Sequence, residues 1–519
     1  MKKIYSIILT LILVLSTSCE QDSFFELDRP NQAPWQNVSE LELAVRSPYL
    51  FMSGKAWTNP LGMLPLRGFG ESDISMYLNG MTGDSYYYAY NDRSWETLVL
   101  QGSKELERAF HFLYDIITET NAAIDFIQNA EDAGKDVFPN MDDSDRKLVK
   151  RYKGELLFMR AVAYWYLART WAPPYDSEGK NDTRHFVLRL HYVNSAEELQ
   201  NPQLATVGEV YDAIVSDLKN ASECLPETYA NSDNGQRMRV NKYAAEAMLA
   251  RVLFYMGRFS ETKTYLDDVI SQTSLYDLNN EPYEAWNKTS GEGFSKEVIW
   301  EMCWDLASNH YDRNPGIMNY YAYNTRVGKA SGYIAFAMSY YALQQIGWMD
   351  QNYQETEEAR SDKRYTQLYK RVSEYSGVKV PLVFLYKYFR GSNMEDAAQR
   401  RANRPMIRLA DLYIMRSEIN WLNNDKELAA ADLNVVRKRA GLPDINSSIL
   451  TEKDIENERI KELAGENADR IYWLIALHKD IPIGNRDPSK FQPIKYPYSK
   501  YYYQIPLLEQ QTNNAYSQE

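Results

Sequence analysis

The stretch 148-LVKRYKGELLFMRAVAYWYLART-170 decides the fold of this chain of 519 residues. Its apolar residues recur at steps of three and four, at Leu148, Tyr152, Leu156, Met159, Ala163 and Tyr166. This spacing predicts a long helix with one packed apolar face. Pro173 and Pro174 follow and are predicted to end the helix, because proline cannot continue the ladder of backbone hydrogen bonds.

A pair of helices joined by a short turn is predicted between Val240 and Gln272. Helical spacing runs up to Gly257, which stands where a left-handed glycine commonly ends a helix. Ser260 follows, and its hydroxyl is suited to cap the first turn of a partner helix.

The same arrangement returns late in the chain, with helices predicted at Ile407–Leu422 and Lys426–Ala440. Paired helices with short turns and alanine-rich faces resemble tetratricopeptide hairpins, which must stack because one pair cannot bury its apolar face alone. No strict repeat of about 34 residues is present. We therefore predict a mainly α fold, with tetratricopeptide-like helical hairpins scattered through one domain.

Long segments without helical spacing separate the hairpins, at about 51–103, 172–206, 273–405 and 480–519. We predict long irregular loops there, with little β structure. Loops of this length are usually functional or disordered, and the Trp and Tyr content of these segments argues against disorder.

The N-terminus reads as the export signal of a bacterial lipoprotein. A basic start and a short apolar run, Ile4 to Leu15, lead through small residues to Cys19, the predicted site of cleavage and lipid attachment. The run is too short for a membrane span of about 20 residues. The predicted organisation is a signal peptide at 1–18, a lipidated tether at 19–40 and one domain at 41–519, with parts at about 41–272 and 273–519.

The formal charge of −13 argues against a nucleic-acid-binding protein, because phosphate backbones are bound by clustered cations. Loss of residues 1–18 removes two lysines and leaves −15. The compact basic run Arg437–Arg439 is better explained as the C-terminal end of a helix. Cys224 and Cys303 could pair in an oxidising compartment, but their spacing does not require it, and two buried thiols are favoured.

Several motifs follow one another in a characteristic order. They are 121-NAAI-124, 153-KGELLFMRA-161, 241-NKYAAEAMLAR-251, 408-RLADLY-413, 433-LNVVRKRAG-441 and 458-ERIKEL-463. This order resembles the SusD-like (RagB/SusD) family of nutrient-binding lipoproteins of Gram-negative outer membranes. The resemblance implies a cell-surface protein that acts as a lid over a SusC-like TonB-dependent transporter, breaks no bond and needs no cofactor.

Charged residues of these motifs lie in or beside amphipathic helices and are predicted to be structural, as Arg–carboxylate pairs that orient one hairpin against another. They are Arg160, Arg408, Asp411, Glu418, Arg437, Glu458 and Arg470. Neither a Gly-x-Ser-x-Gly nor a His-Glu-x-x-His motif occurs, and the five histidines are scattered. We therefore predict no catalytic residue and no metal site.

Three stretches mix aromatic rings with Asn, Asp and Arg, as a sugar site requires, because sugar C–H faces stack on rings while hydroxyls form hydrogen bonds. They are Asp73–Trp95, the residues around Tyr283 and Trp286, and Trp304–Tyr323. The ligand-binding candidates are Asp73, Asn79, Tyr86, Tyr88, Asn91, Arg93, Trp95, Trp286, Tyr320 and Tyr323. A few of the rings are predicted to form a shallow platform, although packing competes as the explanation for any single ring.

The predicted function is the capture of an extracellular nutrient, with an oligosaccharide or polysaccharide favoured, for delivery to the transporter. A peptide ligand, as in RagB-like proteins, is the first alternative. A helical glycoside hydrolase is the second, and an internal scaffold of hairpins, which the export signal disfavours, is the third.

Overall fold

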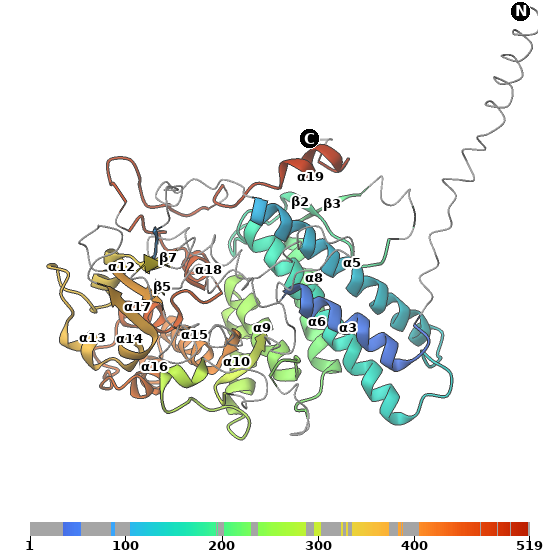
Figure 1. The fold of residues 1–519 in the computed structure, drawn as a ribbon, viewed down its shortest axis with the longest axis horizontal. Coiled ribbons are helices and arrows are strands. Elements are labelled where there is room, and N and C mark those ends of the chain that lie inside the picture. The colour runs from blue at the N-terminus through green and yellow to red at the C-terminus, as the bar shows by residue number, and fades with distance from the viewer. Residues whose placement is uncertain are drawn as a thin grey trace, which may run out of the picture.

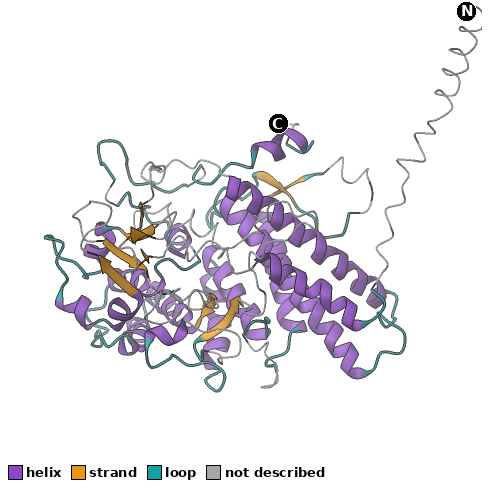
Figure 2. Cartoon of the chain, in the orientation of Figure 1, coloured by secondary structure: helices purple, strands orange, loops and turns teal. Residues whose placement is uncertain are grey.

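A computed structural model shows a mainly helical chain with short strands (Figures 1 and 2). It describes residues 35–52, 85–88, 104–193, 195, 202–229, 237–286, 295–302, 323–324, 329–330, 335–372, 382–385, 387, 404–467, 469–484, 486–498 and 500–516. Four helices lie side by side on the right of Figure 1. They are α3 (Val38–Met52), α5 (Lys104–Asp132), α6 (Asp143–Trp171) and α8 (Val207–Cys224).

Helix α6 contains the predicted stretch 148–170, so that prediction is confirmed. Asp142 caps the helix by accepting a hydrogen bond from the backbone N–H of Asp145, whose side chain accepts one in return. Every residue from Gly154 to Trp171 is buried. The prediction of a single packed face was therefore wrong, because α3, α5 and α8 all pack against α6.

The first predicted hairpin is present as α9 (Lys242–Tyr255) and α10 (Phe259–Ser271). Gly257 adopts a φ of +72°, as predicted for a left-handed helix end. Ser260 lies inside α10 and does not cap it, because the turn is shorter than predicted and Arg258 occupies the N-cap position.

The second predicted hairpin is α15 (Leu409–Leu422) and α16 (Lys426–Arg439). It begins at Leu409 and not at Ile407, because Arg404–Arg408 form strand β10. Helix α10 packs against α15, so the two hairpins stack. The later helices are α17 (Glu452–Leu463), α18 (Asp469–Ala476) and α19 (Leu507–Thr512).

A four-stranded antiparallel sheet stands apart from the long helices, in the order β1 (Ser85–Tyr88), β7 (Ala335–Met338), β9 (Leu382–Leu385) and β8 (Tyr369–Val372). The paired short strands are β4 (Val298–Met302) with β10, β2 (Arg184–Val187) with β3 (Leu204–Thr206), and β5 (Tyr323–Asn324) with β6 (Lys329–Ala330). The segment 273–405 also holds η2 (Pro282–Ala285), α12 (Tyr340–Gln345), α13 (Glu357–Ser361) and α14 (Lys363–Leu368). It is therefore less irregular than predicted.

The described residues form three hydrophobic cores, of which the smallest lies between α15, α16 and α17. The largest takes side chains from Leu41 to Ile505, and we call the elements around it the helical body. The second lies under the four-stranded sheet together with η2 and α12 to α14, and we call this part the sheet body. Because the largest core draws on both ends of the chain, the boundary near residue 272 stays a prediction. None of the helices described by the structure is long and apolar enough to cross a membrane.

Candidate functional site

Two of the three predicted aromatic stretches have described residues in the sheet body. Strand β1 belongs to the first stretch and pairs with β7, with the backbone of Tyr86 opposite Ala337. Trp286 of the second stretch shares a hydrophobic core with Met338 of β7. The third stretch ends at β5, which pairs with β6 outside the four-stranded sheet. Strand β1 and Trp286, which are remote in sequence, therefore lie in one part of the fold.

Most of the predicted site residues lie outside the described residues. These are Cys19, Asp73, Asn79, Asn91, Arg93, Trp95 and Tyr320, and also Cys303. Tyr86 and Tyr88 lie in β1 and Tyr323 in β5, where only the backbone is described. The platform therefore stays a prediction. Cys224 is a free, partly buried thiol, and its pairing with Cys303 is untested.

Trp286 is the candidate whose side chain the structure places, and it lies in the core. Only 2% of the residue is exposed. The guanidinium of Arg408 lies 5.1 Å from the ring centroid and the ammonium of Lys387 lies 5.6 Å from it. The ring is thus engaged by the protein's own cations and is not presented to a ligand in this structure.

The exposed ring of this stretch is Tyr283, with 48% of the residue exposed. The chain turns inward directly after η2, where Trp286 adopts an extended conformation. Two further exposed tyrosines, Tyr341 at 37% and Tyr353 at 41%, also belong to the sheet body. They were not among the predicted candidates. The neutral amide residues around Tyr353 were a sequence signal that could have indicated it.

A buried charge network joins the two bodies at Arg408. This residue follows Ile407 of the largest core, and its guanidinium donates to Glu297, Glu462 and Glu466. Arg439 also donates to Glu297 and Glu462. Burial raises the pKa of Glu462, but the surrounding guanidinium groups, Arg439 first, lower it well below its ordinary value. The network therefore holds the carboxylate of Glu462 ionised inside the protein.

The predicted structural pairs are confirmed for most of the motif residues. Arg160 donates to both oxygens of Asp217 at 2.7 Å, and Asp411 accepts from Arg251 at 2.8 Å. Arg437 pairs with Glu458, and Arg470 with Glu456.

Glu418 does not follow the predicted pattern. It is fully buried, and neither carboxylate oxygen has a hydrogen-bond partner among the described residues. Burial raises the pKa of Glu418 to about 7. The prediction of an Arg–carboxylate pair was therefore wrong here, because no guanidinium of the described residues pairs with this buried carboxylate.

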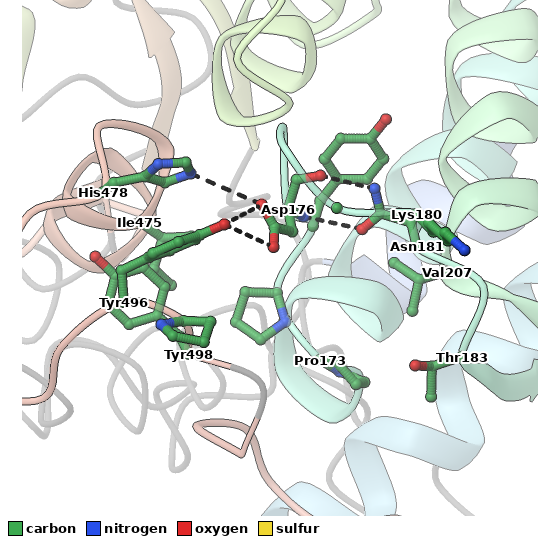
Figure 3. Close-up of a pocket in the computed structure, with 14 residues that line it drawn as sticks. Pro173, Asp176, Lys180, Asn181, Thr183, Val207, Ile475, His478, Tyr496 and Tyr498 are labelled. Carbon is green, nitrogen blue, oxygen red and sulfur yellow. Dashed lines mark hydrogen bonds and ion pairs between the residues drawn. The ribbon is translucent and has the colours of Figure 1, made fainter.

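A small cavity lies where the loop after α6 meets the loop after α18 and the C-terminal segment (Figure 3). Both oxygens of Asp176 accept from the hydroxyl of Tyr496, at 2.9 and 3.0 Å, and this hydrogen bond raises the pKa of Tyr496. The imidazole of His478 stacks on the Tyr496 ring with centroids 4.0 Å apart. Its Nε2 lies 3.3 Å from the hydroxyl of Ser177.

The cavity measures about 140 Å³. A cavity of about 150 Å³ accommodates benzene, so this one has room for a single small ring. Asn181 fixes its wall through two hydrogen bonds to the main chain of Asp176. The cavity could not be predicted from the sequence, because Asp176 and His478 belong to no motif and are far apart in the chain. Among the described residues, no three His, Cys, Asp or Glu side chains gather as metal ligands would.

Comparison with known proteins agrees with this fold. A family model described as starch-binding and associating with the outer membrane matches residues 72–254, and the SusD family model matches residues 340–473. SusD-like protein P2 of Formosa agariphila is 24% identical over 323 residues, and the match covers 58% of this chain and 58% of that protein's length.

Solved structures resemble nearly the whole chain. A SusD superfamily protein from Bacteroides thetaiotaomicron is 20% identical with a TM-score of 0.72, covering 92% of this chain and 98% of that one. A laminarin-binding SusD-like protein is 18% identical with a TM-score of 0.66, with coverage of 92% and 98%. Because the two family models together match more than half of the residues, in the regions where the sequence motifs occur, the chain belongs to the SusD (RagB/SusD) family.

Proposed function

We propose that the protein is a cell-surface lipoprotein that binds an oligosaccharide or polysaccharide and delivers it to a TonB-dependent outer-membrane transporter. The observation that carries the proposal is the match of residues 72–254 to a family model described as starch-binding and associating with the outer membrane. SusD family proteins bind their ligands and are not enzymes. The ligand is therefore passed on intact.

The binding surface that we propose is the aromatic part of the sheet body. Tyr283 is exposed there, and Tyr86 and Tyr88 belong to strand β1 of the four-stranded sheet. We include Tyr323 of β5 on its sequence context alone. Exposed rings beside polar side chains suit a ligand that is partly apolar and partly hydroxylated.

Affinity electrophoresis of the purified protein tests the proposal. Gels that contain laminarin, starch or another neutral polysaccharide should retard the wild type in at least one case. Alanine in place of Tyr88, Trp95, Tyr320 or Tyr323 should reduce the retardation, whereas Leu428→Ala, an exposed position on α16, should not. Binding that survives all four aromatic changes would contradict the platform.

Two other outcomes would replace the proposal. Retention of members of a peptide library, with no retardation by any polysaccharide, would make the protein a peptide binder. New reducing ends after incubation with a polysaccharide would make it a hydrolase.

The envelope location has its own test. Labelling cells with a fatty-acid analogue should mark the wild type, and Cys19→Ala should abolish both the label and the membrane association. Purification of the lipidated protein from outer membranes should recover a TonB-dependent transporter with it. Recovery of the protein alone under mild detergent would contradict the partnership.

A further inference from the structure

A tight turn in the sheet body holds an exposed tyrosine in a conformation that tyrosine disfavours. The loop 351–353 is closed by hydrogen bonds from Tyr353 N to Asp350 O and from Asp350 N to Gln354 O. Tyr353 has a φ of +60°. The third residue of such a loop is normally glycine, because a Cβ atom is strained in the left-handed region.

Side-chain contacts hold this turn rigidly. The carboxylate of Asp350 accepts from the backbone N–H groups of Asn352 and Gln354, each at 2.8 Å. Arg371 of β8 donates to the carbonyl of Tyr353 at 3.1 Å. The Tyr353 ring packs edge-on against the Tyr340 ring, with the ring centroids 4.5 Å apart. The ring is therefore fixed in position, with 41% of the residue exposed.

The neighbours of the ring have the chemistry of a neutral hydrogen-bonding surface. Gln351, Asn352 and Gln354 are all exposed, and each side chain carries a neutral amide. The amides of Gln351 and Asn352 make no hydrogen bond to the described residues. Each amide offers both a donor and an acceptor, which is what a sugar hydroxyl needs.

We propose that the turn 351–354 is a glycan contact. In it the face of a neutral sugar ring stacks on Tyr353, and sugar hydroxyls pair with the amides of Gln351 and Asn352. The proposal rests on the proposed function and adds a site on a different turn from the predicted platform. Strained residues persist where the surrounding structure holds them for a role, and a glycine here would remove the strain together with the ring.

Three substitutions separate the ring from the strain. Tyr353→Ala removes the ring and keeps the strain, Tyr353→Asn removes the ring and relieves the strain, and Tyr353→Phe keeps the ring. Asparagine tolerates the left-handed region, so Tyr353→Asn should unfold about 1 to 2 °C above Tyr353→Ala. Both should bind laminarin or soluble starch, whichever retards the wild type more, about five-fold more weakly. Tyr353→Phe should bind within about two-fold of the wild type.

Leu428→Ala serves as the control, because this residue is 50% exposed on α16, outside the sheet body. It should leave binding unchanged. If the wild type binds a polysaccharide and both Tyr353→Ala and Tyr353→Asn bind it equally well, this inference is overturned while the proposed function stands. If the wild type binds neither laminarin nor starch nor any other neutral polysaccharide, the proposed function and this inference fail together.

Discussion

The two bodies of the molecule use their aromatic residues differently. In the helical body, Trp165 stacks in parallel with Tyr255, and the guanidinium of Arg169 lies 3.8 Å from the Trp165 ring, all of them buried. In the sheet body, Trp286 and Trp348 are buried in the core, whereas Tyr283 and Tyr353 are exposed. The buried rings of the helical body serve its own packing, whereas the sheet body also keeps rings at its surface, where we propose that they contact a ligand.

The largest expected effect comes from breaking the joint between the bodies. Arg408→Ala should lower the free energy of unfolding by about 3 to 5 kcal/mol, because three buried carboxylates lose the cation that they share. Arg439 remains paired with Glu297 and Glu462, and Lys387 remains paired with Glu466. Urea unfolding measures the loss. Arg146→Ala removes an exposed ion pair with Asp136 and should leave the free energy of unfolding almost unchanged. Equal losses for the two variants would contradict the network's role.

Trp286 and Tyr283 belong to one short segment, but Trp286 is buried and Tyr283 is exposed. Trp286→Ala should cost about 3 to 5 kcal/mol of stability, because it opens a cavity beside Arg408. Tyr283→Ala should cost less than about 0.5 kcal/mol, because the ring is exposed. Thermal unfolding and affinity electrophoresis should be run on both variants. A stable Trp286→Ala variant that has lost glycan binding would restore the sequence-based prediction for Trp286.

The helices of the helical body could be predicted from the sequence, because the residue patterns that indicate them lie within short segments. The apolar spacing within α6 and the helix end at Gly257 can each be predicted from neighbouring residues. The pairing of β1 with β7 is not readable in this way, because it joins residues 85–88 to residues 335–338. Without that pairing, the similar composition of the aromatic stretches is the only reason to group them.

The candidate site was harder to predict, because the fold decides which aromatic rings are buried and which are exposed to a ligand. Trp286 and Tyr283 stand close together in the same aromatic stretch, and their opposite fates depend on the turn after η2. The left-handed conformation of Tyr353 leaves no mark in the sequence, since a tyrosine at that position argues against it. The unpaired state of Glu418 likewise depends on where the neighbouring helices place their cations.

Glu418→Gln tests a buried carboxylate that lacks the pairing seen around Arg408. The pKa of Glu418 is raised to about 7 mainly by burial, while Lys479 and Arg459 lower it and Glu452 and Glu456 raise it. A carboxyl with a raised folded-state pKa binds its proton more tightly when folded, so its contribution is complete below about pH 4.5 and is lost as the pH rises to about 7.

The Gln variant should therefore be more stable than the wild type by about 2 to 3 kcal/mol at pH 8, and the difference should vanish near pH 4. Urea unfolding across this pH range measures both values. A difference that does not change with pH would show that the pKa of Glu418 is the same in the folded and unfolded protein.

The smallest expected effect tests how closely the helical body is packed. A Cβ atom on Gly154 of α6 would lie 2.9 Å from the Cβ of Cys224 and from the Cγ of Leu225, at the end of α8. Gly154→Ala should therefore cost about 1 to 2 kcal/mol, although alanine favours a helix. Gly208→Ala is the matched control, because a Cβ atom there meets its nearest neighbour only at 3.4 Å. Gly208→Ala should leave the free energy of unfolding unchanged or raise it slightly. Equal losses for Gly208→Ala and Gly154→Ala would show that the close approach of α6 and α8 is not the cause of the loss at Gly154.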